Sequence, residues 1–87
     1  MKPEFSKKAS KFISAQDRPT KGRIRKAINK LLKSPPEGNI KLLQGYDKKT
    51  FRLRVGKFRI IFTYETDNEN KKYLYIADVD SRGDIYK

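Results

Sequence analysis

The sequence predicts an α+β domain in which an N-terminal helical hairpin packs on a mainly antiparallel sheet of three or four strands. Two observations carry this prediction. Apolar residues recur at helical spacing in the first third of the chain, and from Asn39 onward they alternate with the period of two that is typical of strands. With 87 residues, the chain has the length of one small domain, so we expect residues 1–87 to share one fold.

Two helices are expected before the Ser-Pro-Pro segment at 34–36. Ser6 suits the N-cap of the first helix, which extends to about Gln16. Its apolar stripe consists of Ala9, Phe12 and Ile13. Asp17 and Pro19 open the second helix, and the prolines of 34–36 end it. The apolar residues of this helix fall at i, i+3, i+4, i+7 and i+8, so they share one face: Ile24, Ala27, Ile28, Leu31 and Leu32.

The strands are expected to form a meander after the helices. A short strand at about Lys2–Phe5 precedes the helices, which gives the element order β-α-α-β-β-β. The segments with alternating apolar residues are 39–43, 50–55, 57–64 and 72–79.

The segment FRLRVGKFRIIF at 51–62 predicts a hairpin with one basic face. Gly56 and Lys57 suit a two-residue turn, which places Arg54 opposite Arg59 on the neighbouring strand. One face of the hairpin is then wholly apolar and seats the second helix: Phe51, Leu53, Val55, Phe58, Ile60 and Phe62. The other face carries Arg52, Arg54 and Arg59.

Like charges that face each other across a sheet are destabilising, so the three arginines suggest a missing anion. Guanidinium groups on a rigid platform offer forked donors to a phosphate, a geometry that lysine supplies less well. The alternative is that Asp78 or Asp80 on a neighbouring strand neutralises these arginines.

The charge of the chain also indicates an anionic partner. Lysine and arginine total 22 against 10 acidic residues, which gives a net charge of +12, and the alternative is simply a charged, soluble surface. The chain has no cysteine and no histidine, which excludes disulfides, thiolate nucleophiles, Cys/His metal sites and an imidazole base. We therefore expect no metal or cofactor. No apolar run suggests a signal peptide or a membrane span, so a cytoplasmic protein is expected.

Two segments together resemble the RelE/ParE superfamily of bacterial type II toxins. These are FRLRVGKFRIIF at 51–62 and YIADVDSRGDIYK at 75–87, and NIKLLQG at 39–45 resembles the approach to the first core strand. The resemblance covers nearly the whole chain and implies a small toxin that an antitoxin silences. RelE-like members cleave messenger RNA on the ribosome without a metal, whereas ParE-like members poison DNA gyrase.

The resemblance also implies a set of catalytic residues. In the RelE-like pattern, the matching positions in this chain are Arg52, Arg54, Arg59, Arg82 and Tyr86. RelE-like members often have lysines at the first two positions, and another version has a histidine where this chain has Ser81. A tyrosine pKa of about 10 is lowered by nearby cations, which makes Tyr86 the first choice for the base. The alternatives are that Tyr86 only packs or stacks on a base and that Arg82 pairs with Asp84.

A second group of cations lies on the solvent side of the second helix. The default interpretation is a solvated helix face, but in a toxin that docks on the ribosome these charges would bind ribosomal RNA without reading sequence. With the turn lysine, the candidate residues are Lys21, Arg23, Arg25, Lys26, Lys30, Lys33 and Lys57.

The implied partners are a cognate antitoxin with an acidic toxin-binding segment, the ribosome and messenger RNA, without a membrane. Operator DNA is expected to be contacted only through the antitoxin complex. Two rival functions remain open, a gyrase poison and a noncatalytic nucleic-acid-binding module.

Overall fold

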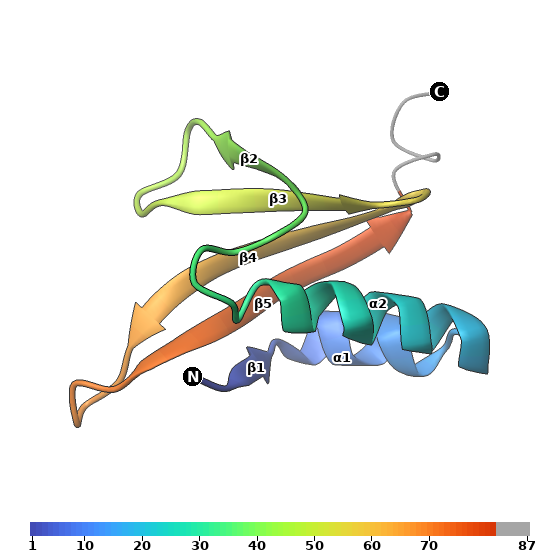
Figure 1. The fold of residues 1–87 in the computed structure, drawn as a ribbon, viewed down its shortest axis with the longest axis horizontal. Coiled ribbons are helices and arrows are strands. Elements are labelled where there is room, and N and C mark those ends of the chain that lie inside the picture. Colours follow the sequence, from blue (N-terminus) through green and yellow to red (C-terminus); the bar gives the residue numbers. More distant parts are fainter. Residues whose placement is uncertain (82–87) are drawn as a thin grey trace.

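The computed structural model describes residues 1–81 and places two helices against one face of a five-stranded sheet (Figure 1). This confirms the predicted α+β class and the helical hairpin. The sheet has five strands because the N-terminal strand joins all four of the predicted period-two segments. The elements are β1 (Pro3–Phe5), α1 (Lys7–Ser14), α2 (Arg18–Lys30), β2 (Asn39–Leu43), β3 (Thr50–Val55), β4 (Phe58–Thr66) and β5 (Lys72–Ser81).

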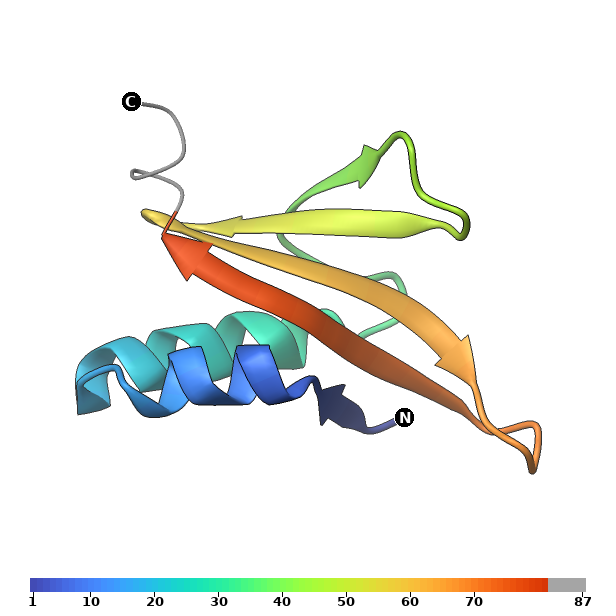
Figure 2. The ribbon, with the colours of Figure 1, turned by 180° about the vertical axis from the view of Figure 1, so that it is seen from behind.

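The sheet has the strand order β1-β5-β4-β3-β2, so β1 and β2 form its two edges. β1 runs parallel to β5, and the other neighbours are antiparallel, as the meander prediction requires. Hydrogen bonds fix β1 at this edge, with the Leu74 N–H donating to the Lys2 carbonyl at 2.9 Å and the Ser6 N–H donating to the Ile76 carbonyl at 3.0 Å. Figure 2 shows the same arrangement from behind, with both helices on one side of the sheet. We call the other side the open face.

Both predicted helix N-caps are confirmed. The Ser6 hydroxyl accepts a hydrogen bond from the Ala9 N–H at 3.0 Å and donates one to the Ala77 carbonyl at 2.7 Å, which ties the start of α1 to β5. The Asp17 carboxylate accepts from the Thr20 N–H at 2.9 Å, and its hydrogen bonds to Thr20 lower the pKa of Asp17.

The second helix ends earlier than predicted. α2 ends at Lys30 instead of at the prolines of 34–36, and a turn follows it. The Lys30 carbonyl accepts from the Glu37 N–H at 3.0 Å, and the Leu31 carbonyl accepts from the Tyr64 hydroxyl at 2.9 Å. These contacts provide partners for carbonyls at the end of α2, one of them from Glu37 just after the prolines.

The core lies between the helices and the sheet. The apolar stripes predicted for the two helices pack there, with Ala9, Ile24, Ile28 and Leu31 at most 2% exposed. Phe62, which is fully buried, stacks on Phe51 with ring centroids 5.4 Å apart. The buried sheet residues in this cluster are Leu53, Phe58, Ile60, Phe62, Leu74, Ile76 and Val79.

Candidate nucleic-acid interface

The hairpin register brings the predicted arginines to the open face. Gly56 and Lys57 form the turn between β3 and β4, and Arg54 lies directly opposite Arg59, as predicted. Arg52 lies opposite Ile61 on the same face. Because side chains alternate along a strand, the apolar residues of the same hairpin point to the helices. We call Arg52, Arg54 and Arg59 the arginine platform.

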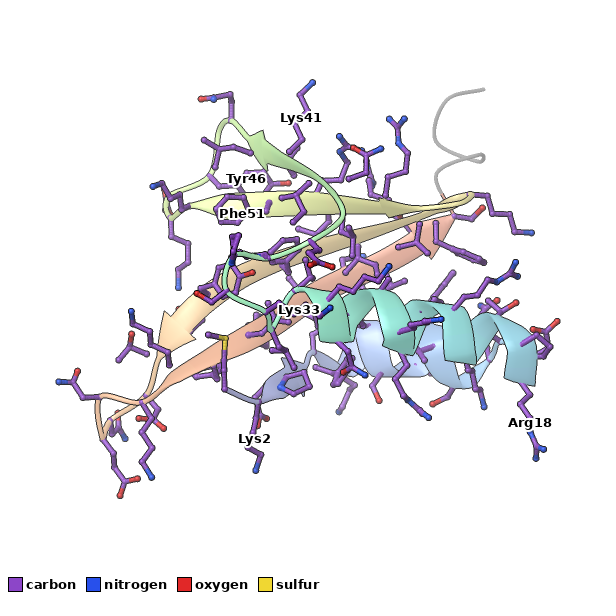
Figure 3. All side chains as sticks on the ribbon, viewed as in Figure 1. Lys2, Arg18, Lys33, Lys41, Tyr46 and Phe51 are labelled. Carbon is purple, nitrogen blue, oxygen red and sulfur yellow. The ribbon has the colours of Figure 1, made fainter. Side chains whose placement is uncertain are left out.

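Lys41 extends the arginine platform onto β2. It lies opposite Arg52, and Figure 3 shows its side chain at the far side of the sheet from the helices. Lys41 was not among the site residues predicted from the sequence. The sequence pattern could have identified it, because antiparallel pairing of the period-two segments 39–43 and 50–55 places this lysine beside the arginines.

An aspartate on β5 anchors Arg59. The Arg59 Nε donates to Asp80 Oδ1 at 3.2 Å, and its Nη2 donates to Asp80 Oδ2 at 2.9 Å. Both side chains are partly buried, with 24% and 31% exposure. The predicted alternative of neutralisation by Asp80 is therefore confirmed for this arginine, and the paired contact fixes the plane of its guanidinium.

The other two arginines differ in exposure. Arg54 is exposed to solvent, whereas Arg52 is only 8% exposed. Within residues 1–81, Arg52 Nη1 is a buried donor without a hydrogen-bond partner. A buried donor that lacks a partner costs about 1–3 kcal/mol, so an anion that reached Arg52 would remove this cost.

The second predicted neutraliser, Asp78, pairs elsewhere. Its Oδ2 lies 3.4 Å from Lys8 Nζ on α1, whereas its Oδ1 is buried without a partner among the described residues. The ion pair with α1 joins the helix layer to the edge of β5, so the alternative that Asp78 neutralises the arginine platform is not supported.

A polar cluster borders the arginine platform on β3 and β4. The Glu65 carboxylate accepts from the Thr63 hydroxyl at 2.5 Å and from Lys48 Nζ at 3.1 and 3.3 Å, and these hydrogen bonds lower the pKa of Glu65. The Thr50 hydroxyl donates to the Lys48 carbonyl at 3.0 Å. The cluster ties the loop between β2 and β3 to β4.

The predicted helix cations form a second basic surface, on the opposite side of the sheet from the arginine platform. Lys33 and Arg18 project from this layer in Figure 3. Lys21 is half-buried and the others on α2 and after it are exposed: Arg23, Arg25, Lys26, Lys30 and Lys33. Lys33 also lies 3.5 Å from Glu37. Lys57 lies at the hairpin turn with its Nζ 5.6 Å from the Phe58 ring centroid, and it lines a pocket with Arg23. The helix cations nonetheless adjoin the arginine platform, because Arg23, Lys26 and Lys30 line one pocket together with Arg54.

Two predicted catalytic residues, Arg82 and Tyr86, lie outside the described residues 1–81. Within that range, no group of three or more acidic side chains is placed to hold a metal ion. No helix there has the length and apolar character needed to cross a membrane.

Comparison with known proteins bears on the family and the fold of the chain. Residues 4–86 match the family model described as the ParE toxin of the type II toxin-antitoxin system, parDE. A search of curated proteins finds no match. Among solved structures, the chain is similar to one from the RelB-RelE antitoxin-toxin complex of Methanococcus jannaschii. The TM-score is 0.66 with 25% sequence identity, covering 94% of this chain and 93% of the other.

Proposed function

The chain belongs to the ParE toxin family of type II toxin-antitoxin systems, within the RelE/ParE superfamily, and from its arginine platform we propose that it inhibits translation by cleaving messenger RNA on the ribosome. One observation carries this proposal. The cross-strand pair of Arg54 and Arg59 lies beside the buried, unpartnered donor of Arg52 on a face that no helix of residues 1–81 covers. Such an arrangement would suit the charge of a phosphate.

The arginine platform suits RNA cleavage without a metal. In this reaction the 2′-hydroxyl loses its proton and attacks the adjacent phosphorus, while the 5′-oxygen of the next nucleotide leaves and takes up a proton. The phosphorane between these steps carries two negative charges. Arg54, which is exposed, would contact its oxygens directly, and Arg59 would act as a donor held in place by Asp80.

The proton transfers are assigned to the end of the chain. From the resemblance, Arg82 would add a further positive charge and Tyr86 would accept the proton of the 2′-hydroxyl, because cations close to a phenol favour its charged form. With histidine and cysteine absent from the sequence, positioning of the messenger by the ribosome would supply much of the rate.

Docking on the ribosome is assigned to the helix layer. The exposed cations of α2 would contact ribosomal RNA through its phosphates, while the arginine platform on the other side of the sheet would face the messenger. Because Arg23, Lys26 and Lys30 line a pocket together with Arg54, the ribosomal contacts would come mainly from cations outside this pocket, such as Arg25.

The purified chain in a bacterial translation extract tests the proposal. We expect messenger RNA cuts that require assembled ribosomes and that persist with EDTA under conditions that keep the ribosome intact. Rapid cutting of RNA without ribosomes would contradict the ribosome dependence. Stoichiometric RNA binding without any cut product would indicate a noncatalytic binding module.

A gyrase poison is the second candidate, because the matching family model is named for ParE. In this case purified gyrase, supercoiled DNA and the chain would accumulate trapped DNA cleavage complexes. Cleavage complexes without any messenger cuts would replace the first proposal with this one.

An antitoxin partner is proposed for the chain in either case. The similar structure is an antitoxin-toxin complex, and the charge of +12 favours a partner with an acidic toxin-binding segment. Such a segment is expected to be disordered when free and to fold on the toxin. We assign the chain to the cytoplasm, with operator DNA contacted only through the antitoxin complex.

A further inference from the structure

Two tyrosines of β5, Tyr73 and Tyr75, lie on the open face beside the arginine platform. The register of β4 and β5 places Tyr75 opposite Thr63, an open-face residue, and Tyr73 shares this face because side chains alternate along a strand. Arg52 lies two strands away and one two-residue step along the sheet. From the spacing of strands and residues, the Cα atoms of Arg52 and Tyr75 are about 12 Å apart. One strand of RNA can therefore contact both the arginine platform and the rings.

The fold makes little use of these two rings within residues 1–81. Tyr64 on β4 shows what a structural tyrosine does in this domain, because its ring packs in the aromatic cluster of the core and its hydroxyl donates to the Leu31 carbonyl at 2.9 Å. Tyr73 and Tyr75 pair with no other ring and make no side-chain hydrogen bond among the described residues, and both are only half-buried. Their rings are therefore available to a ligand.

Cations surround the two tyrosines in a hollow at the β1 edge of the sheet. Lys2, Lys71 and Lys72 line this hollow together with both rings. One acidic residue of the hollow, Asp67, is used by the turn after β4, where its carboxylate accepts from the backbone N–H groups of Glu69 and Lys71, both at 2.9 Å. Aromatic rings interleaved with cations are the arrangement that holds single-stranded nucleic acid, since bases stack on the rings and phosphates contact the cations.

We propose that Tyr73 and Tyr75 stack on bases of the RNA strand whose phosphate lies on the arginine platform. This inference rests on the proposed messenger cleavage and adds a subsite to it. The bases of single-stranded RNA can splay outward and stack on aromatic side chains. Because the two tyrosines are two residues apart on β5, their Cα atoms are about 7 Å apart, so each ring would take a separate base. Stacking would hold the flanking nucleotides while the arginines hold the phosphate.

Glu4 on β1 gives this subsite a base preference. Glu4 and Tyr75 are partners in the parallel pairing of β1 and β5, so their side chains share the open face. Glu4 is exposed and makes no hydrogen bond or ion pair with another described residue. A carboxylate accepts a hydrogen bond from the amino group at N4 of cytosine, whereas uracil has a carbonyl oxygen at this position. Cytosine on the Tyr75 ring is therefore favoured over uracil.

An RNA that cannot be cleaved tests stacking apart from catalysis. The probe is a fluorescein-labelled hexamer of 2′-O-methylcytidine, whose blocked 2′-oxygen cannot attack the phosphate, with binding followed by anisotropy at low salt. Tyr75→Leu removes the aromatic face, and Tyr75→Phe keeps it. We expect about tenfold weaker binding for Tyr75→Leu and little change for Tyr75→Phe. Tyr46→Leu is the matched control and should bind like the wild-type chain, because Tyr46 is 55% exposed and does not line this hollow.

A hexamer with the same backbone but without bases separates stacking from phosphate contacts. It should bind the wild-type chain at least tenfold more weakly than the cytidine hexamer, although it keeps every phosphate. Tyr75→Leu should weaken it no further, because the ring then has no base to stack on. Circular dichroism and urea titration check that the Tyr75 variants fold, and the wild-type comparison of the two hexamers does not depend on any variant.

A hexamer of 2′-O-methyluridine tests the base preference. It should bind the wild-type chain several-fold more weakly than the cytidine hexamer. Glu4→Gln should remove most of this difference, because an amide can donate to uracil as well as accept from cytosine. Equal binding of the two hexamers to the wild-type chain would overturn the assignment of Glu4.

Three outcomes would overturn the stacking subsite. They are equal binding of the cytidine hexamer by Tyr75→Leu and Tyr75→Phe, equal binding of the hexamers with and without bases, and an unchanged affinity in Arg54→Ala. The last result would show that the rings and the arginine platform do not hold the same strand. None of these measurements uses RNA cleavage or gyrase, so failure of the proposed activity would be seen separately in the translation extract.

Discussion

The two faces of the sheet are built from the same strands but serve different purposes. Ile60 on the helix side is fully buried among apolar residues, whereas its chain neighbours Arg59 and Ile61 lie on the open face. The buried residues that the sheet presents to the helices are apolar, and the helix layer adds one buried polar residue, Thr20. The open face combines the arginine platform with buried Thr50 and Thr63. The period of two thus lets one hairpin supply a core on one side and a charged surface on the other.

The buried polar residues are distributed unevenly between the two sides of the sheet. Of the four buried polar residues in the described part of the chain, three lie on β3 and β4 at open-face positions: Thr50, Arg52 and Thr63. Burying such groups is unfavourable unless they find partners. Thr50 and Thr63 have partners in the Lys48 carbonyl and Glu65, whereas Arg52 Nη1 has none among the described residues, and we infer that this arginine is retained for binding.

Replacement of adjacent isoleucines tests this comparison with the largest expected effect. Ile60→Ala opens a cavity between the sheet and the helices and should lower the free energy of unfolding by about 3–4 kcal/mol. Ile61→Ala should lower it by only about 1–2 kcal/mol, because the flexible stems of nearby arginines can fill the space. Urea titrations of both variants give the values. Equal losses would show that the open face is packed as tightly as the core.

Replacement of Arg54 tests the functional half of the comparison. Arg54→Ala should reduce messenger cleavage in the translation extract about hundredfold, as expected when one preorganised charge is removed from a transition state. Stability should stay the same or rise slightly, since a like-charge pair with Arg59 is removed.

The control for Arg54 is Arg25, an exposed cation of α2 that does not line the pocket of Arg54. Arg25→Ala should change cleavage by less than about tenfold, with a weaker salt dependence, because one phosphate contact among several is lost. If Arg25→Ala were as damaging as Arg54→Ala, the assignment of catalysis to the open face would be wrong. Restored cleavage in Arg54→Lys would indicate that charge alone, without the forked geometry, is sufficient.

Local patterns in the sequence were enough to predict most of the fold. The hairpin register is confirmed because a Gly-Lys turn allows few alternatives, and both N-caps are confirmed because their chemistry lies within four residues. The predicted end of α2 was wrong, and the contacts at its actual end include one from far along the chain, the Tyr64 hydroxyl that donates to the Leu31 carbonyl. The parallel pairing of β1 with β5 likewise depends on contacts between the two ends of the chain.

The candidate site was predicted in part for the same reason. The arginine platform lies within one hairpin, so its arrangement follows from local register. Which of Asp78 and Asp80 pairs with Arg59 depends on the register between β4 and β5. Both aspartates lie at least 19 residues after Arg59 in the sequence, so local patterns could not decide between them. The contact of Lys8 with Asp78 joins α1 to β5 and has no local signal in the sequence.

Acid titration offers a smaller test on the border of the open face. Hydrogen bonds from Thr63 and Lys48 lower the pKa of Glu65 below its ordinary value of 4.5. A carboxylate with a lowered pKa in the folded state contributes stability above the ordinary value, and this contribution is lost as the pH falls through the folded-state pKa. Glu65→Gln should therefore cost about 1 kcal/mol at pH 7 and progressively less below about pH 4.5. Urea midpoints of the wild-type chain and Glu65→Gln, measured at pH 7 and again below about pH 4.5, check this. A difference between the two proteins that does not change with pH would contradict the prediction.

The smallest predicted effect concerns Gly22, on the solvent side of α2. A β-carbon built at this position has no neighbouring atom within 4 Å, and its backbone is helical. Gly22→Ala should therefore raise the free energy of unfolding by about 0.5–1 kcal/mol through the entropy of the unfolded chain. Gly56→Ala is the matched control with the opposite sign, because Gly56 has a φ of 58° in the hairpin turn, where a β-carbon is strained. Urea titrations of Gly22→Ala and Gly56→Ala measure both changes in the free energy of unfolding, and opposite signs would show that backbone conformation determines them. If Gly22→Ala stabilises the chain but lowers ribosome-dependent cleavage, the surface of α2 makes close contact with the ribosome, whereas unchanged cleavage would indicate that its cations act from a distance.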